Sequence, residues 1–315
     1  MNTRVAFVFP GQGSQSVGMG QAWANQYPEA RQAYAEADDA LGFAISEMCW
    51  SGPESDLQLT ANTQPALLAT AVAILRVVEK SVVSPVAVAG HSLGEYAALV
   101  AAGSLQYSDA LRLVRRRGEF MQEAVPVGVG AMAAILGLAA SEVAAVTAAV
   151  PADEVCTVAN LNAPDQTVIA GHTGAVERAV EQCQERGARR AIMLPVSAPF
   201  HSPLMVPARE NLTPFLEETE FLDPEIPVVS NIDAMPTVSG AAARDALVRQ
   251  IDGPVRWVES VIWLADQANV ELFVEVGPGR VLAGLNRRIA PQAKTISLHE
   301  PGGLEKLQER LGEST

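Results

Sequence analysis

The sequence contains few cysteines and no long apolar run, and each shortage excludes a class of protein. Cys49, Cys156 and Cys183 stand far apart without metal-ligand spacing, which indicates buried thiols in a reducing compartment and no metal centre. No stretch of about 18 uninterrupted apolar residues is present, so we expect no membrane span. The segment before Pro10 has too few apolar residues for a signal peptide, so we expect a cytoplasmic protein.

Positive charge is also scarce. The chain has 22 lysines and arginines against 36 aspartates and glutamates, and the formal net charge of -14 argues against nucleic acid or an anionic membrane as a partner. Hydrophobic residues make up 49% of the 315 residues, enough for a sizeable core. Basic residues cluster only locally, at 112–117, 189–190 and 287–288, and such clusters are mostly solvated surface.

The glycine-rich segment "FPGQGSQ" lacks the residues of two phosphate-binding motifs. It contains no Gly-Lys-Ser/Thr, so it is not a P-loop, and Gly11-x-Gly13 followed by Ser16 fails the dinucleotide-binding pattern at its third glycine. A loop at the end of a strand remains, with exposed backbone N–H groups. Such a loop is suited to donate one hydrogen bond to an oxyanion.

Strand-like runs alternate with helical patterns along most of the chain, which predicts an α/β fold with a mainly parallel sheet. The expected strands are "VAFVFP", "PVAVAG", "PVVSNI" and "ELFVEVGPG", and a last helix is expected near the C-terminus. One helix, "TQPALLATAVAILRVVEK", is expected to open at Thr63 with Pro65 in its first turn, and another, at 107–125, has Ser108 as its cap. We expect residues 1–127 and 197–315 to form a large α/β-hydrolase-like domain.

Residues 128–196 follow a different order. "AMAAILGL" predicts a strand, "SEVAAVTAAV" a helix capped by Ser141, "VCTVANLN" and "QTVIAGH" two strands, "GAVERAVEQCQERG" a helix and "RRAIMLPV" a strand. This βαββαβ order is typical of a ferredoxin-like unit. We therefore expect residues 128–196 to be an inserted small subdomain.

The stretch "AGHSLGEY" places Ser92 in a Gly-x-Ser-x-Gly pattern between a short apolar strand and an apolar helix. A strand, a tight turn and a helix form the setting of a nucleophile elbow, in which the serine lies at the helix N-terminus. Gly90 and Gly94 then allow the sharp turn and the close approach of neighbouring backbone. The alternative is a serine that only caps its helix.

A serine nucleophile needs a base within hydrogen-bond reach, and four histidines are available. The ring of His91 is expected to point away from the serine, His172 ends a strand of the small subdomain, and His299 lies in the C-terminal tail. His201, in the apolar loop "SAPFHSPLM", follows the return from the small subdomain and is the candidate. No acidic residue occupies an obvious strand-end loop between Ser92 and His201, which weakens an ordinary esterase assignment.

Several segments together resemble the malonyl-CoA:acyl carrier protein transacylases of fatty acid synthesis, whose family includes the acyltransferase domains of polyketide synthases. The resemblance covers about residues 5–285. Its segments, in chain order, are "FVFPGQGSQ", "GHSLGEY", "RRRGEFMQEA", "NLNAPDQTVIAG", "SAPFHSPLM", "QIDGPVRW" and "EVGPG". Each segment is weak alone, but seven in this order form a specific pattern.

The resemblance implies a role for each site residue. Ser92 would be the nucleophile and His201 its general base, oriented by the main-chain carbonyl of Gln250 in place of a carboxylate. The backbone N–H groups of Gln12 and Leu93 would form the oxyanion hole.

Arg117 would pair with the free carboxylate of the malonyl group, since a guanidinium binds a carboxylate bidentately. Arg112, Arg115 and Arg116 have no such match and are expected to be surface residues.

The resemblance implies malonyl transfer from malonyl-CoA to acyl carrier protein through a malonyl-serine intermediate, with no cofactor and no metal. A discrete polyketide-synthase acyltransferase is the close alternative. A serine thioesterase or esterase and a non-catalytic carrier- or CoA-binding protein are the others. We expect a monomer, docking acidic acyl carrier protein through Arg189, Arg190, Arg287 and Arg288.

Overall fold

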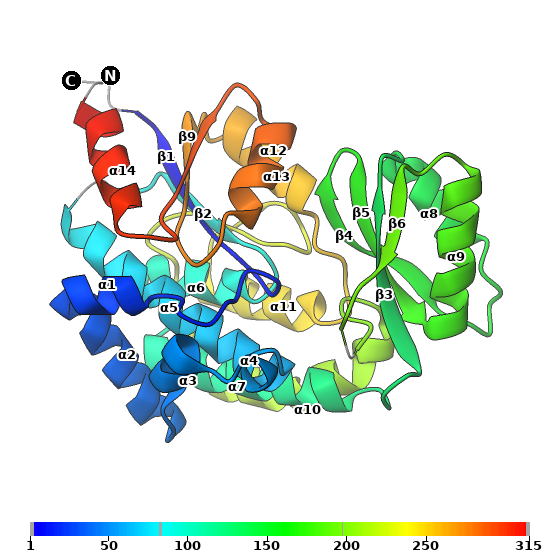
Figure 1. The fold of residues 1–315 in the computed structure, drawn as a ribbon, viewed down its shortest axis with the longest axis horizontal. Helices are drawn as coiled ribbons and strands as arrows, with labels where there is room; N and C mark the ends of the chain where they lie inside the picture. The colour runs from blue at the N-terminus through cyan, green and yellow to red at the C-terminus, as the bar shows by residue number, and fades with distance from the viewer. Residues whose placement is uncertain (1–2, 82–83, 197, 313–315) are drawn as a thin grey trace.

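Two β-sheets organise the computed structural model, which describes residues 3–81, 84–196 and 198–312 (Figure 1). The large sheet has the strand order β10-β9-β1-β2-β7-β8 and is parallel except for the β7–β8 pair. Its strands are β1 Val5–Phe9, β2 Ala87–Gly90, β7 Val228–Val229, β8 Pro236–Thr237, β9 Leu272–Glu275 and β10 Lys294–Ser297. The predicted α/β fold with a mainly parallel sheet is confirmed.

Helices cover both faces of the large sheet because its central strands are apolar on both sides. Along β1, Val5, Phe7 and Phe9 pack into one core cluster, whereas Ala6 and Val8 pack into another. The first face is covered by α1 Gln21–Gln26, α2 Pro28–Leu41, α3 Ile45–Ser51, α4 Glu54–Leu57, α5 Thr60–Ser81, α6 Gly94–Ala101, α7 Tyr107–Glu123, α10 Val206–Glu218, α11 Gly240–Gln250 and α14 Gly302–Gly312. The second face is covered by α12 Trp257–Asp266 and α13 Val281–Ile289.

The long helix α5 begins at Thr60, three residues before the predicted start. The Thr63 hydroxyl donates to the Leu57 carbonyl and does not cap the helix, so that prediction was wrong. Pro65 lies inside the helix and has no N–H to donate to the Ala61 carbonyl, and Arg115 donates to that carbonyl instead at 3.0 Å.

By length and composition, the segment Thr60–Lys80 of α5 could cross a membrane, but 89% of its apolar window is buried inside the structure. Its apolar faces pack against the other helices of the first layer. This burial is typical of the core helix of a globular domain.

Two predicted caps were wrong in the same way. The N-cap of α7 is Gln106 and not Ser108, and the N-cap of α8 is Ala139 and not Ser141. Both capping residues have extended backbone and neither caps with its side chain, so each chain enters its helix two residues before the serine.

The second sheet is antiparallel, with the strand order β4-β5-β3-β6. In chain order its elements are β3 Gly130–Leu136, α8 Ala140–Ala148, β4 Cys156–Ala163, β5 Gln166–His172, α9 Thr173–Glu185 and β6 Arg190–Met193. Both helices pack on one face of this sheet around a separate core cluster. We call this unit the small subdomain; its limits at 128 and 196 stay predictions, and residues 1, 197 and 315, which bound the predicted large domain, lie outside the described residues.

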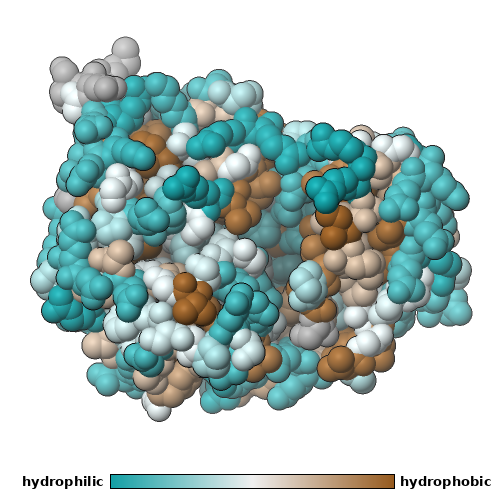
Figure 2. All heavy atoms as spheres, in the orientation of Figure 1, coloured by the Kyte–Doolittle hydropathy of each residue, from teal (hydrophilic) through white to brown (hydrophobic). Residues whose placement is uncertain are grey.

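The face of the small sheet without helices borders the large domain. The backbone of β4 is fixed there, because Leu161 donates to the Val255 carbonyl at 2.9 Å and Val255 donates to the Ala159 carbonyl at 2.8 Å. Figure 2 shows apolar side chains gathered on the small subdomain beside a hollow between the two units. The candidate site lies between them.

Candidate active site

Ser92 lies in the tight turn between β2 and α6, with a left-handed backbone at φ 53°. The turn needs small neighbours: a Cβ on Gly90 would overlap the backbone of Gly94, and a Cβ on Gly94 would overlap the Phe9 carbonyl. The helix begins at Gly94 after the N-cap Leu93, and no side chain caps it. The alternative in which Ser92 only caps the helix is therefore wrong, and its hydroxyl is exposed to the site as in a nucleophile elbow.

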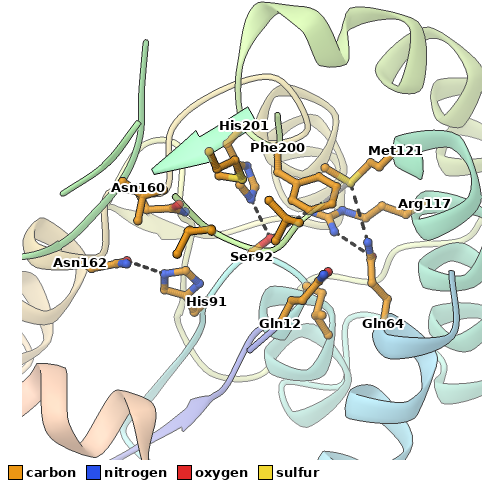
Figure 3. A pocket seen from close by; sticks show the side chains of 15 residues that line it. Gln12, Gln64, His91, Ser92, Arg117, Met121, Asn160, Asn162, Phe200 and His201 are labelled. Atoms are coloured by element: carbon orange, nitrogen blue, oxygen red, sulfur yellow. Dashed lines mark hydrogen bonds between the residues drawn. The ribbon is translucent and has the colours of Figure 1, made fainter. Parts of the chain in front are cut away.

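His201 meets Ser92 from a sequence distance of 109 residues, with Nε2 2.8 Å from the Ser92 Oγ (Figure 3). The Nδ1 faces the main-chain carbonyl oxygens of Gln250 at 2.9 Å and Gly253 at 3.1 Å. Two acceptors at Nδ1 place the ring proton there, so Nε2 is free to accept the serine proton. No carboxylate of the described residues bonds to this imidazole.

The electrostatics of the site keep His201 neutral. Burial, together with the neighbouring Arg117 cation, lowers the pKa of His201 to about 3. The main-chain carbonyls at Nδ1 oppose this only in part. The imidazole is therefore in its basic form at neutral pH.

Arg117 is a buried cation with no carboxylate bonded to it among the described residues. Only 2% of it is exposed. Nη1 donates to Gln64 Oε1 at 2.8 Å, whereas Nη2 donates to Gln250 Oε1 at 2.9 Å and to the Ser92 Oγ at 3.1 Å. Burial lowers the pKa of this guanidinium, so an anion in the site would be favoured. Such an anion would lie directly beside the nucleophile.

These groups border one cavity of about 160 Å³ between the two units. The large domain contributes Gln12, Gln64, His91, Ser92, Leu93, Arg117, Met121, Phe200 and His201 to its lining. The small subdomain side contributes Met132, Asn160, Asn162, Val168, Leu194 and Val196. The polar atoms converge on the large-domain side, and Figure 3 shows Ser92 at their centre.

Gln12 and Leu93 both line this cavity, on the loop after β1 and immediately after Ser92. Neither backbone N–H has an acceptor among the described residues. Two free N–H groups beside a nucleophile can stabilise an oxyanion. The structure thus brings together the six residues singled out from the sequence, and their roles stay proposals.

A second histidine borders the cavity and bonds to the small subdomain. His91 lines the cavity, its Nε2 is 2.8 Å from Asn162 Oδ1, and its ring centroid is 5.6 Å from that of Trp257. As expected from the sequence, its ring is directed away from Ser92, toward Asn162 in β4 of the small subdomain. Burial lowers the pKa of His91.

Three buried polar residues in this network were missed from the sequence: Gln64, Glu95 and Asn231. Gln64 accepts a hydrogen bond from Arg117. Glu95 accepts one from the Gln250 side chain, and Asn231 accepts one from the Ser92 backbone N–H. A signal was present, because Gln64 and Glu95 are polar residues in otherwise apolar helical segments. A polar side chain in such a position needs a partner in the core.

Comparison with known proteins relates the whole chain to one family. A match to the family described as acyl transferase domain covers residues 6–298. The malonyl CoA-acyl carrier protein transacylase of Escherichia coli (strain K12) is 48% identical over 303 residues, which is 96% of this chain and 98% of that protein. The protein of the same name from Bacillus subtilis (strain 168) is 45% identical over 312 residues, covering 99% and 98%.

Solved structures give the same relationship. The malonyl CoA-acyl carrier protein transacylase from Coxiella burnetii superposes with a TM-score of 0.96 at 42% identity, covering 99% of this chain and 98% of that one. A malonyl-transacylase in complex with its type II PKS acyl-carrier protein gives a TM-score of 0.95 at 45% identity, covering 98% and 100%.

Proposed function

The chain belongs to the acyl transferase domain family of the malonyl CoA-acyl carrier protein transacylases, and from this premise we propose that it moves a malonyl group from malonyl-CoA to acyl carrier protein for fatty acid synthesis. The observation that carries the proposal is a nucleophile placed between a base and a buried cation. Ser92 Oγ is 2.8 Å from His201 Nε2 and 3.1 Å from Arg117 Nη2.

In the first half-reaction the Ser92 Oγ attacks the thioester carbonyl carbon while His201 Nε2 takes its proton. The backbone N–H groups of Gln12 and Leu93 bind the oxyanion. The tetrahedral intermediate collapses, the C–S bond breaks, and His201 returns the proton to the sulfur of coenzyme A. Malonyl-Ser92 remains.

In the second half-reaction the phosphopantetheine thiol of acyl carrier protein loses its proton to His201 Nε2 and attacks the ester carbonyl. The Ser92 oxygen leaves and takes the proton back. Thioester, ester and thioester are close in energy, so the cycle is reversible and ping-pong.

Arg117 couples selectivity to rate. The malonyl carboxylate would bind the guanidinium and offset its charge. Because that charge is one of the causes of the low pKa of His201, its neutralisation makes the imidazolium easier to form during attack. Acetyl-CoA has no carboxylate and would gain neither effect.

A serine hydrolase is the rival that the geometry disfavours. It would require a carboxylate at His201 Nδ1, where this structure has two main-chain carbonyl oxygens. It would also give no reason for an arginine buried without a bonded carboxylate beside the nucleophile.

For docking of acidic acyl carrier protein we propose the exposed arginines predicted from the sequence. Of the four predicted arginines, Arg288 already pairs with Asp165 of the small subdomain. Arg189, Arg190 and Arg287 are exposed and carry no ion pair among those of the described residues. Charge reversal at these three should lower the transfer rate in a salt-dependent way.

We further propose a ferredoxin-like small subdomain, a hydrolase-like large domain, a cytoplasmic monomer and a reaction without cofactor. The βαββαβ order with strands β4-β5-β3-β6 supports the first description. Three free, buried cysteines support a reducing compartment. The molar mass in solution, measured by light scattering, tests the monomer.

The deciding experiment is the intact mass of the protein after brief exposure to malonyl-CoA, with acetyl-CoA and Ser92→Ala as controls. One malonyl adduct, absent in the variant and scarce with acetyl-CoA, is expected. Release of coenzyme A without an adduct would indicate a hydrolase, and no turnover at all would favour a binding protein.

A further inference from the structure

Glu95 is a buried carboxyl group that the reaction described above leaves unused. It lies in α6, three residues after Ser92, and is 1% exposed. Its Oε2 accepts hydrogen bonds from the Asn231 backbone at 2.9 Å and from Gln250 Nε2 at 2.8 Å. We propose that Glu95 is a positioning residue for malonyl transfer, because it fixes Asn231 and Gln250 and through them the nucleophile, the base and the substrate-binding guanidinium.

The first connection runs through Asn231 to the elbow. The Asn231 side chain bridges the turn: Oδ1 accepts from the Ser92 N–H at 2.6 Å, and Nδ2 donates to the Gly90 carbonyl at 2.6 Å. These bonds hold both sides of a turn whose central residue is left-handed, a conformation that a non-glycine residue adopts only when its surroundings enforce it. Glu95 in turn fixes the backbone of Asn231 by accepting a hydrogen bond from its N–H.

The second connection runs through Gln250, whose side-chain amide could point either way. Glu95 removes that freedom, because a carboxylate only accepts hydrogen bonds and therefore selects Nε2. The amide oxygen Oε1 then faces Arg117 Nη2 at 2.9 Å, and Nε2 also donates to the Ser92 carbonyl at 3.1 Å. The main-chain carbonyl of Gln250 bonds to Nδ1 of His201, so one residue orients base and guanidinium together.

The third contribution is charge. Glu95 and Arg117 attract each other without a hydrogen bond between them, and burial raises the pKa of Glu95 to about 7 while Arg117 opposes that rise. Near neutral pH, ionised Glu95 therefore balances part of the guanidinium charge and leaves its donors available to substrate. Removing this negative charge should strengthen the preference for a malonyl over an acetyl group.

Three variants separate geometry from charge and from stability. Glu95→Ala removes both hydrogen bonds, whereas Glu95→Gln keeps an acceptor oxygen and removes the charge. Glu275→Gln is the matched control: Glu275 is also fully buried and has its pKa raised to about 7, but its carboxylate accepts from the backbone N–H groups of Leu282 and Ala283 in α13 at 2.9 Å and not from Asn231 or Gln250.

The inference rests on the proposed function, so the first readout uses no malonyl substrate. In the full-length protein, verified as folded by circular dichroism, a fluorophosphonate should label Ser92 of Glu95→Ala about 100-fold more slowly than wild type. Glu95→Gln and Glu275→Gln should stay within roughly threefold of wild type. Wild-type labelling of Glu95→Ala, or an equal loss in Glu275→Gln, would overturn the positioning role.

The second readout is the ratio of malonyl to acetyl adducts on Ser92, measured by mass with both donors present. This ratio should rise in Glu95→Gln and stay unchanged in Glu275→Gln. An unchanged ratio in Glu95→Gln would overturn the charge contribution, including when Glu95→Ala does not fold. If wild type forms no malonyl adduct while the labelling pattern holds, the proposed function fails and the positioning of Ser92 stands.

Discussion

The two walls of the cavity are built from different chemistry. On the large-domain wall, Ser92, His201 and Arg117 are joined by hydrogen bonds through Gln250, and most of this network is buried. The opposite wall, from the small subdomain, is mainly apolar at Met132, Val168, Leu194 and Val196. Asn160 and Asn162 are its polar side chains in the cavity lining.

The groups that react and the groups that exclude water therefore lie on opposite walls of the cavity. Groups that move protons or bind a carboxylate must be held within a fraction of an ångström, and a buried network of fixed partners achieves this. An apolar wall has only to fill space and exclude water, so its residues are more replaceable. We therefore expect substitutions on the two walls to change different quantities.

The largest effect on activity is expected for Ser92→Ala on the large-domain wall. Loss of the nucleophile should lower kcat by on the order of 10⁶-fold and abolish the malonyl adduct in the intact mass. Ser141→Ala, an exposed serine in the small subdomain, is the control and should keep both. A malonyl adduct on the Ser92→Ala protein would show that another residue is acylated.

Arg117→Ala should be next in size and should separate the substrates. Loss of a buried charge partner costs about 3–5 kcal/mol, so transfer of malonyl should fall by about two to four orders of magnitude and transfer of acetyl by much less. Arg116→Ala changes the neighbouring residue of the same helix, whose guanidinium lies 4.1 Å from the Phe215 ring centroid, and should leave the ratio unchanged. If Arg117→Ala keeps the preference for malonyl over acetyl, Arg117 does not bind the malonyl carboxylate.

Leu194→Ala tests the apolar wall. Transfer to acyl carrier protein should stay within roughly threefold of wild type, because no reacting group is moved. Hydrolysis of malonyl-Ser92 without acyl carrier protein should accelerate as water enters, measured as decay of the adduct mass. Ile192→Ala, an exposed residue two positions earlier, is the control. A large loss of transfer with unchanged hydrolysis would mean that this wall also positions reacting groups.

The smallest effect is expected from pH. With the pKa of His201 at about 3, neutral imidazole persists as pH falls, so fluorophosphonate labelling of Ser92 should not lose half its rate near pH 6.5. Arg117 and His91 are the cationic or titratable groups that lower this pKa, and Arg117→Ala should move the acid limb upward. A step near pH 7 that disappears in Glu95→Gln would belong to Glu95. Loss of half the labelling rate near pH 6.5 in both wild type and Glu95→Gln would contradict a buried, neutral His201.

Much of the scaffold was predictable because local periodicity specifies it. The segment "QTVIAGH" forms β5 over the predicted residues, and most of "GAVERAVEQCQERG" lies in α9. The predictions of serine N-caps for α7 and α8 were wrong because the N-caps are Gln106 and Ala139, which make no capping hydrogen bond with their side chains. The two-residue strands β7 and β8 have too few residues for an alternation pattern to define.

The site was predictable where a motif encodes it and not where only contact does. Ser92 has a recognisable turn around it, and His201 lies in an apolar loop at the return from the small subdomain. The family resemblance singled out Arg117 and Gln250. Nothing local indicates that Asn231 meets the Ser92 backbone, 139 residues away. Its partner Glu95 was visible as an acid in an apolar helix, but a sequence does not say which core atoms a buried carboxylate will meet.

The tight packing of Gly90 and Gly94 has a consequence for directed evolution. No side chain fits at either position without displacing the backbone that carries Ser92, so a library randomised across the elbow would consist largely of inactive members. Diversity aimed at new acyl donors is better placed on the small-subdomain lining, where Met132, Val168 and Leu194 border the same space. The elbow glycines are therefore positions to keep in such a library, and the small-subdomain lining residues are positions to vary.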